Sequence, residues 1–466
     1  MECFTINFNK IEGRLDCHFY RPEFTAILTK LKQIKYPVVL LSELTKRPKG
    51  DIQNFGAYSL CNFIKFIDKG IPFIKVENYD EYGIKWDTVQ YISEEVHQIL
   101  PKSKLKKDDV LLSMAGTIGI STSFKENFEA NSNQAIAKIR LSDERVTPEF
   151  LSIFFNSKIG YLQSLRISNG AVQLNINLGE IGQILIPILP KQLQDKIASL
   201  MYTAYSLKKS RESEAQKLLD SLNDYVLDEL GIKLPELKDR MVYVVNSDEV
   251  KHKRANAYYY QPKFEELEKA IKKGKFEVKK LEKFITKIHY GASVKNEYVD
   301  DGIPLLRIMN LKPNKIDLRD VVKLPETMKK DLGNAFVNEG DLLISRSGTV
   351  GVVSVVPKEA EGFAFGSFMI KFCLNEGQDK SYIAAWLNTK LQKLLTEREK
   401  IGAIQGNITI ETIENFKIPL PPFDVQNKIA EEVKRRMQKA EQLQKEAKEE
   451  LVKAKQEVEK IILGDN

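Results

Sequence analysis

Residues 170–190 read GAVQLNINLGEIGQILIPILP, and residues 402–422 read GAIQGNITIETIENFKIPLPP. The two stretches align without a gap at an offset of 232 residues. The offset is close to half of the 466 residues, so the sequence predicts two copies of one domain and not a solenoid of short repeats. Sequence further upstream aligns at the same offset: GIPFIK from Gly70 with GIPLLR from Gly302, and DDVLLSMAGTIG from Asp108 with GDLLISRSGTVG from Gly340.

Each repeat ends in a long stretch with helical periodicity. Residues 191–230 contain no Pro or Gly, and their apolar residues recur in steps of three and four, as do those of residues 424–463. Gly231 follows the first stretch and Gly464 the second, as helix stop signals do. Each stretch predicts one amphipathic helix about 60 Å long at 1.5 Å per residue.

The two helices are predicted to pack on each other within the chain, because both apolar stripes approximate a heptad spacing. If the halves are related by a two-fold axis, the helices run antiparallel. The alternative is a pair of solvated helices held by Glu–Lys pairs one turn apart. Between the helices, β-branched runs such as IPFIKV and DLLISR alternate with helical segments that start at Pro148 and Lys380, which predicts an α+β fold of two duplicated α/β blocks. The predicted boundaries are 1–190, 191–231, 232–422 and 423–466.

The composition is that of a globular protein with an intracellular location. Apolar residues make up 42% and charged residues 29%, and the net charge of +7 permits a polyanionic partner without requiring one. The four cysteines, at 3, 17, 61 and 373, have no CxxC spacing, so neither a disulfide framework nor a zinc site is expected. The polar N-terminus and the lack of a long apolar run predict a cytoplasmic protein without a membrane span.

Motifs for catalysis are missing from the sequence. It has no HExxH pair, no phosphate-binding GxxxxGK[ST] loop and no GxSxG turn. The run Leu420-Pro421-Pro422-Phe423 has Leu where amino-methyltransferases place the Asn or Asp that grips the target amine. The acidic pairs at 108–109 and 300–301 are predicted to be turn residues. The sequence therefore predicts a non-catalytic chain with no metal site.

The repeated stretches are the GIP strands from Gly70 and Gly302, the SGTxG-like turns after Asp108 and Gly340, the GAxQxNI runs from Gly170 and Gly402, and the two long helices. In their order and duplication they resemble the specificity (S) subunits of type I restriction-modification systems, over essentially the whole chain. The resemblance implies that 1–190 and 232–422 are target recognition domains, each reading half of a bipartite double-stranded DNA target. It implies that the helices form an antiparallel, pseudo-two-fold spacer that sets the unread gap and holds two modification (methyltransferase) subunits, to which restriction subunits add. S-adenosylmethionine would then bind the modification subunit, and ATP and Mg the restriction subunit.

Side chains that follow two matched strands are the predicted DNA contacts. Arg pairs well with guanine and Asn with adenine, while Lys and Ser reach phosphates or base edges. The alternative is that these side chains only build turns or cover a solvent-exposed strand face. The predicted DNA-binding residues are Lys75, Asn78, Tyr79 and Ser113 in the first repeat, and Arg307, Asn310, Arg346 and Ser347 in the second.

Gln173, Asn175, Gln405 and Asn407 recur in both repeats. A recurring residue is poorly suited to reading two different half-sites, so these four are predicted to build a shared turn or to contact a partner. Residues 25–69 and 265–301 differ between the repeats, so the two half-sites should differ. Two rival functions stay open: the specificity subunit of a type IIB system, and a DNA-independent coiled-coil scaffold for two protein partners.

Overall fold

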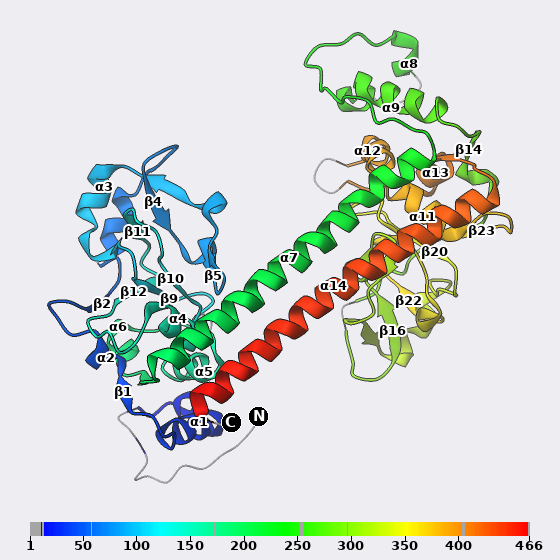
Figure 1. The fold of residues 1–466 in the computed structure, drawn as a ribbon. Coiled ribbons are helices and arrows are strands. Elements are labelled where there is room, and N and C mark those ends of the chain that lie inside the picture. Colours follow the sequence, from blue (N-terminus) through cyan, green and yellow to red (C-terminus); the bar gives the residue numbers. More distant parts are fainter. Residues whose placement is uncertain are drawn as a thin grey trace. The chain divides into compact units, whose positions relative to one another are not determined.

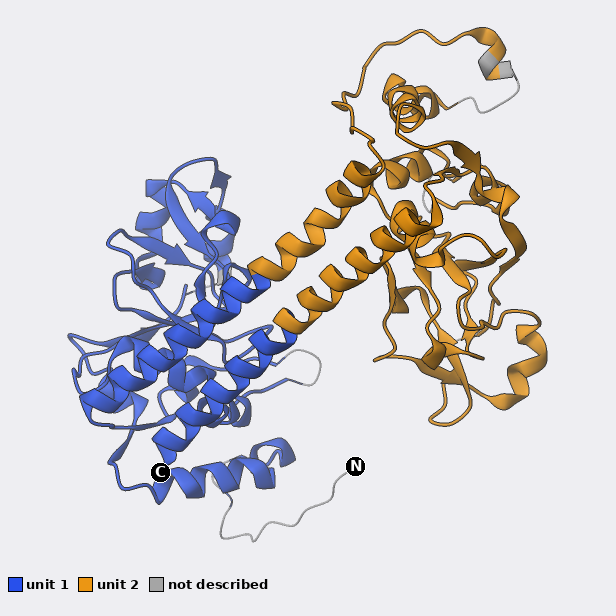
Figure 2. Ribbon diagram, turned by 45° about the vertical axis from the view of Figure 1, so that its right-hand side comes forward, with its two compact units in different colours: residues 1–212, 444–466 blue, residues 213–443 orange. Residues whose placement is uncertain are grey.

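The structure is a computed structural model that describes residues 11, 14–56, 58–170, 174–251, 256–295, 297–402 and 406–464. The chain divides into two compact units (Figure 2). Unit 1 consists of residues 1–212 and 444–466, and unit 2 consists of residues 213–443. Each unit therefore combines one repeat with a segment of each long helix, α7 (Lys191–Glu229) and α14 (Phe423–Leu463).

Unit 1 is built on two small β-sheets (Figure 1). The first is antiparallel, in the order β10 (Ser121–Ser123), β9 (Val110–Ser113), β12 (Ile136–Arg140) and β2 (Asp51–Gln53). The second is mixed, because β4 and β11 run parallel; its order is β3 (Phe66–Ile67), β7 (Gln90–Ile92), β4 (Ile71–Ile74), β11 (Ala130–Ser132) and β8 (Lys104–Leu105). Two short pairs complete the strands: β1 (Val38–Leu40) with β13 (Leu185–Pro187), and β5 (Tyr79–Asp80) with β6 (Gly83–Ile84).

Unit 2 repeats this architecture. Its antiparallel sheet has the order β15 (Ile285–Tyr290), β23 (Met369–Leu374), β20 (Leu342–Ser345) and β21 (Val353–Val355). Its mixed sheet is shorter, with β19 (Val322–Leu324), β16 (Ile303–Leu306) and β22 (Ala364–Phe365). The short pairs recur as β14 (Val278–Lys280) with β24 (Lys417–Pro419), and β17 (Leu311–Lys312) with β18 (Lys315–Ile316).

Helices cover these sheets. The helices predicted from Pro148 and Lys380 are confirmed as α4 (Pro148–Asn156) and α11 (Lys380–Leu387), and each is followed at once by a second helix. Unit 1 carries α1 (Pro22–Lys32), α2 (Leu41–Leu44), α3 (Glu94–Ile99), α4 (Pro148–Asn156), α5 (Lys158–Arg166) and α6 (Leu178–Ile181). Unit 2 carries α8 (Ser247–Lys251), α9 (Pro262–Lys272), α10 (Lys329–Leu332), α11 (Lys380–Leu387), α12 (Lys390–Arg398) and α13 (Ile410–Glu414).

The two repeats share side-chain to backbone hydrogen bonds as well as strand order. Asn156 holds the backbone of Ser121 with both its amide N and O, and Asn388 holds Val353 in the same way. A buried Gln at the start of each long helix, Gln194 in one and Gln426 in the other, likewise ties the helix to the preceding backbone. Buried amides need such partners, so the repeats keep these residues to hold the same fold.

The long helices run antiparallel where unit 2 shows both. Lys428 on α14 pairs with Glu229 on α7 at 2.8 Å, and Arg436 on α14 donates to the Ser221 hydroxyl at 2.8 Å. A step of eight residues forward on α14 therefore corresponds to a step of eight residues back on α7. Further along α7, Ala215 is buried against Ala440 and Leu443 of α14. The predicted antiparallel pair of long helices is confirmed.

In unit 1 the helix segments join the core of the globular block. Ile197 and Met201 of α7 and Val458 and Ile462 of α14 belong to the same apolar cluster as the sheet residues. The Arg211 guanidinium lies 3.8 Å from the Glu446 carboxylate across the two helices. No helix among the described residues combines the length and apolarity needed to cross a membrane.

The predicted turn at Asp108–Asp109 is confirmed, because the Asp109 amide donates to the Lys106 carbonyl at 3.1 Å. Asp109 has a second role that the sequence did not reveal. Its carboxylate is buried, accepts two hydrogen bonds from the Arg140 guanidinium at 2.7 and 2.6 Å, and caps the Lys106 amide at 2.8 Å. Burial raises the pKa of Asp109, and the Arg140 contacts oppose that rise. Asp108 does lie in a turn, with a φ of 71°. Asp109 is therefore a core residue that anchors the edge of β12.

Candidate nucleic-acid interface

The basic residues Lys75 and Arg307 stand at equivalent places, directly after β4 and β16. Each is followed by a short 3-10 turn that a buried Asn closes. The Asn78 side-chain oxygen accepts from the Lys75 amide at 2.8 Å, and that of Asn310 accepts from the Arg307 amide at 2.8 Å. The Asn78 amide group donates to the Thr88 carbonyl, also inside the unit. These two Asn residues thus hold the turn that presents the basic side chain.

An aromatic ring lies beside each of these cations. Lys75 Nζ lies 5.4 Å from the centroid of the Phe66 ring, and Arg307 Cζ lies 5.6 Å from that of Tyr298. Phe66 and Tyr298 are themselves separated by the repeat offset, and they are 44% and 43% exposed. A cation held over an exposed ring combines a phosphate contact with a stacking surface. Sequence reasoning missed both rings, although their shared position within otherwise divergent segments was a usable signal.

Arg346 adds a third cation with a ring partner, in unit 2 only. Its guanidinium lies 4.8 Å from the centroid of the half-exposed Tyr290 ring. Its backbone is fixed on both sides, because the amide donates to the Phe368 carbonyl at 2.9 Å and the carbonyl accepts from Ile408 at 3.0 Å. Its Nε is buried and has no hydrogen-bond partner among the described residues. The equivalent position in unit 1 is the buried, uncharged Met114.

Four of the other predicted DNA-binding residues are enclosed by their own unit. The Ser113 hydroxyl donates to the Thr117 carbonyl and accepts from the Ile120 amide. Tyr79 is buried, and burial raises the pKa of its hydroxyl. Asn78 and Asn310 are committed to the turns described above. A base-reading role for these four stays a prediction, but side chains whose polar atoms are enclosed by the fold reach DNA poorly.

Each unit has its own set of β-bridges around the recurring Asn, and in unit 2 that set includes Ser347. The Asn175 backbone pairs with Asn169, and the Asn407 backbone pairs with Ile401 in the same two-way fashion. Asn407 also bridges to Ser347, as Asn175 does to Ala115. These bridges build a turn that the two units share; contact with a partner stays a prediction. Gln173 and Gln405, predicted for the same role, lie outside the described residues.

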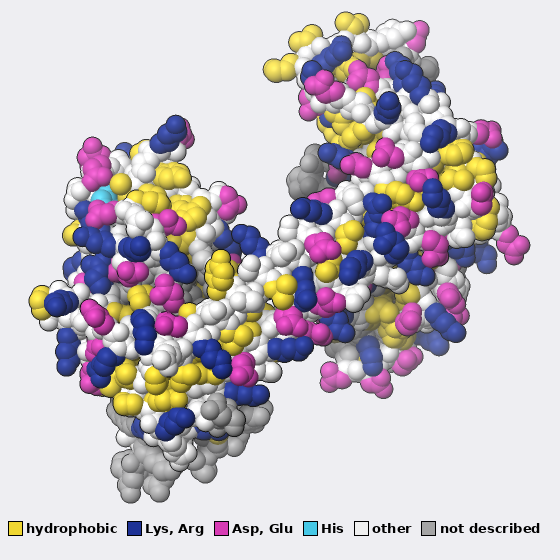
Figure 3. Space-filling view, viewed as in Figure 1, with side chains coloured by type: hydrophobic (Ala, Val, Ile, Leu, Met, Phe, Trp, Pro, Cys, Tyr) yellow, Lys and Arg dark blue, Asp and Glu magenta, His cyan; other side chains and the backbone are white. Residues whose placement is uncertain are grey.

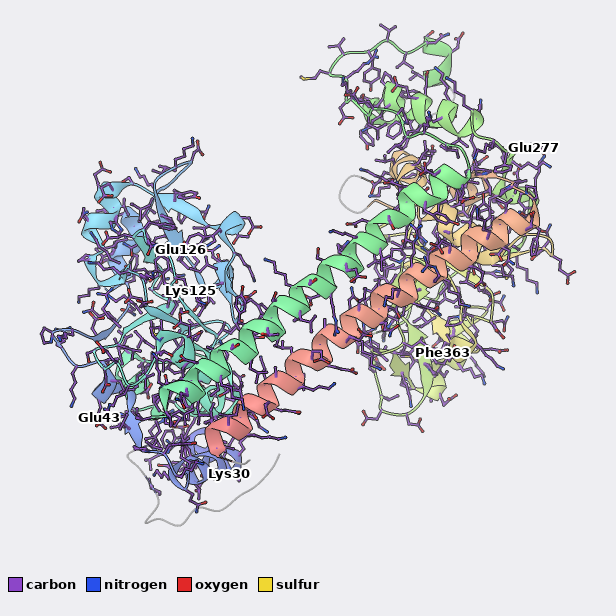
Figure 4. The ribbon with its side chains drawn as sticks, in the orientation of Figure 1. Lys30, Glu43, Lys125, Glu126, Glu277 and Phe363 are labelled. Atoms are coloured by element: carbon purple, nitrogen blue, oxygen red, sulfur yellow. The ribbon has the colours of Figure 1, made fainter. Side chains whose placement is uncertain are left out.

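The surface charge is mixed. On the face shown in Figure 3, Lys and Arg alternate with Asp and Glu instead of forming one large basic patch. Figure 4 labels one adjacent pair of opposite sign, Lys125 and Glu126, in the loop between β10 and β11. Among the described residues, no group of three or more His, Cys, Asp or Glu is placed to hold a metal ion. Lys75 and Arg307 are themselves paired with the Glu77 and Asp320 carboxylates, at 3.0 and 3.2 Å. A DNA contact by Lys75, Arg307 or Arg346 stays a prediction.

Comparison with known proteins gives one consistent answer. The family described as "Type I restriction modification DNA specificity domain" matches residues 49–219 and 273–453, once in each repeat. The MjaVIII specificity subunit of Methanocaldococcus jannaschii is 22% identical over 422 residues, which covers 86% of this chain and 90% of that protein. The EcoBI specificity subunit of Escherichia coli is 23% identical over 158 residues, so the chain spans only 33% of its length, and 34% of this chain is covered.

Among solved structures, a chain from a study of complex assembly and conformational transition in a type I R-M system has the same fold. The alignment covers 92% of this chain and 96% of the other, with 15% identity and a TM-score of 0.53. The two family matches together cover well over half of the 466 residues. The chain therefore belongs to the family of type I restriction modification DNA specificity domains, and it carries that domain twice.

Proposed function

We propose that this chain is the DNA-recognition subunit of a type I restriction-modification complex and that each repeat reads one half of a bipartite target. One observation carries the proposal. The two units share their hydrogen-bonded scaffold, residue for residue at positions such as Asn156 and Asn388, while the exposed side chains on that scaffold differ. Two different half-sites require different base-contacting side chains on the same backbone scaffold.

The proposed domain limits follow from the repeat. Residues 1–190 and 232–422 act as target recognition domains, and residues 191–231 and 423–466 act as spacer helices. Lys75 contacts the first half-site, and Arg307 and Arg346 contact the second. Arg346 has the stronger case as a base reader, because its backbone is fixed on both sides and its guanidinium is oriented by Tyr290.

The chain itself performs no chemistry in this proposal. Two modification subunits bring S-adenosylmethionine, and restriction subunits bring ATP and Mg. The complex works in the cytoplasm on double-stranded DNA. The recurring turn around Asn175 and Asn407 suits a contact that both modification subunits make alike.

Two alternative functions can be distinguished from this proposal. A type IIB specificity subunit would work with a single protein that fuses nuclease and methyltransferase, so the neighbouring genes separate it from the proposal. A DNA-independent scaffold would bind its protein partners but show no salt-dependent affinity for DNA. Every relative compared above is named as a type I protein, which favours the proposal over both.

The test is methylation mapping in the source genome with and without this gene. We expect one bipartite motif to lose methylation on deletion and to regain it when the gene is restored. Exchange of residues 25–190 for the equivalent block of a related subunit should then change one half-site and leave the other. Loss of no motif, or a change in both half-sites, would contradict the proposal.

A further inference from the structure

Unit 2 contains a cavity of about 510 Å³ beside the turn that carries Arg346. Its floor and walls are largely apolar and include Leu311 and Val352, both buried. At the cavity, Met309 and Phe368 remain 50% and 47% exposed. Large apolar side chains that stay exposed beside a cavity are typical of a surface that binds a ligand or partner.

Two lysines line the same cavity, Lys312 on β17 and Lys393 on α12. Neither side chain makes an ion pair or hydrogen bond with any residue in the described part of the chain. Lys393 is half-buried, and that burial lowers the pKa of its amine. A desolvated cation without a partner is unfavourable until an anion arrives. The ligand that fits these walls is therefore apolar in one part and negatively charged in another.

Polar groups in the wall can read the edge of such a ligand. The Ser347 hydroxyl makes no hydrogen bond with the residues that the structure describes. The neighbouring Gly348 has a φ of +73°, and a Cβ built there would meet no atom within 4 Å. The turn therefore presents an uncovered backbone to the cavity, where a ligand can approach closely.

Unit 1 is built differently at the equivalent positions. Tyr79 replaces Leu311, and Tyr161 replaces Lys393, with its ring against Gly119. Glu77 replaces Met309 and is paired with Lys75 at 3.0 Å. A protein partner that binds both repeats alike would need the same walls in both. The difference instead matches a ligand that is specific to one half-site.

We propose that this cavity holds one nucleotide of the DNA target, unstacked from its neighbours, with the base against Met309 and Phe368 and the phosphate at Lys312 and Lys393. The proposal rests on the DNA-reading function proposed above and adds a substrate contact to it. Stacking on apolar and aromatic side chains, together with the phosphate contact, offsets the cost of unstacking the base. Ser347 is placed to contact the polar edge of the base.

The experiment uses the full chain assembled with its modification subunits, on duplexes whose target is known from methylation mapping. Each adenine of the second half-site and gap is replaced in turn by fluorescent 2-aminopurine, and each thymine is probed with permanganate. The methylated adenine is scored separately, because methyltransferases extrude their own target base. We expect one further unstacked position on the side read by unit 2.

Three variants locate that position. Leu311→Tyr fills the cavity with the side chain that unit 1 uses, and Phe368→Ala removes a half-exposed wall. Each should abolish the further signal and weaken DNA binding at least tenfold, while the signal of the methylated adenine remains. Lys312→Ala combined with Lys393→Gln should reduce the slope of log K against log salt by about 0.9 for the lost phosphate contact. Lys358→Ala, an exposed lysine outside the cavity wall, should change nothing.

Several outcomes overturn the inference. Unstacking confined to the methylated adenine, or a further signal that survives Leu311→Tyr in a complex that still assembles, places the nucleotide elsewhere. An unchanged salt slope in the double lysine variant removes the phosphate contact. Weaker assembly with modification subunits in the absence of DNA, seen for the lysine and Phe368 variants, makes the cavity a protein-docking site. If the wild-type complex binds no specific DNA, the proposed function itself fails.

Discussion

The side-chain oxygen of Asn223 accepts a hydrogen bond from the backbone amide of Lys390 at 2.7 Å. This bond joins α7 to the first turn of α12 in unit 2. Unit 1 has a matching bond, because Glu459 of α14 accepts from the amide of Lys158 at the start of α5 at 2.9 Å. The first amides of a helix have no partner within it, so in each unit the long helix supplied by the other repeat completes a globular helix.

Removal of this bond should loosen the start of α12. Asn223→Ala leaves the Lys390 amide without its acceptor, so we expect a local cost of about 1 kcal/mol, as for loss of a helix cap. Asn223→Asp keeps an acceptor and should behave as the wild type. Hydrogen exchange measured by mass spectrometry on peptides that cover residues 388–395 should be faster in the alanine variant only. Equal exchange in both variants would show that the contact does not hold the helix.

The second half-site should depend on Arg346. Arg346→Ala should weaken binding by about 1–3 kcal/mol and relax specificity at one base pair if the guanidinium reads guanine. The first half-site should be unaffected in this variant. Binding to duplexes with single substitutions in each half-site measures both effects. A uniform loss across all sequences, with a smaller salt slope, would make Arg346 a phosphate contact instead.

Lys75→Ala offers the reciprocal test in unit 1. Its loss should affect the first half-site only, because its ring partner Phe66 and its carboxylate partner Glu77 belong to the same unit. Lys125, exposed on the same unit and labelled in Figure 4, provides the matched control. Lys125→Ala should leave both half-sites intact. An equal effect of the two lysine variants would mean that only bulk charge matters.

The sequence predicts periodic features of this chain well and long-range pairings poorly. The helix over residues 191–230 was predictable because Pro and Gly are absent and the apolar spacing is regular; the structure places it at Lys191–Glu229. The Asp109–Arg140 pair was not predictable, because its partners are far apart in the sequence and meet only through the β9–β12 register. Asn78 shows a second limit, since the repeat reveals that an amide recurs but not that it points inward.

Acid should selectively weaken the packing of α9 in unit 2. Burial pushes the pKa of Glu268 up, but ion pairs with Lys417 and Arg398 outweigh burial and lower it. The folded state then binds the proton more weakly than the unfolded chain. This stabilisation is complete above the unfolded pKa of about 4.3 and is lost as pH falls through the lowered value.

Glu268→Gln measures that contribution. At pH 7 it should destabilise unit 2 by about 0.5–1 kcal/mol, a value already reduced for solvent screening. The difference in thermal midpoint between variant and wild type should shrink as pH falls below about 4. Glu265→Gln, an exposed glutamate on the same helix, is the control and should show a smaller difference. A Glu268 difference that is constant with pH would exclude an ionic origin.

The long helices should set the length of the unread gap in the DNA target. Arg211 of α7 faces Glu446 of α14, so an insertion after Glu212 needs its match beside Ala447. Four residues lengthen a helix by about 6 Å and nearly preserve its phase, because one turn takes about 3.6 residues. Base pairs rise about 3.4 Å each, so the paired four-residue insertion should lengthen the preferred gap by roughly one to two base pairs.

Helical phase supplies the control for that insertion. Two inserted residues rotate the stripe by about 200° and turn residues such as Ala215 away from α14, so the paired two-residue variant should fail to assemble with its modification subunits. Methylation of duplexes that carry both half-sites at varied gaps measures the optimum for the four-residue variant. If that variant assembles, methylates and keeps the original optimum, the helices hold partners but do not measure DNA. A shifted optimum requires the helix pair to transmit the added length, since no other element of the chain has been changed.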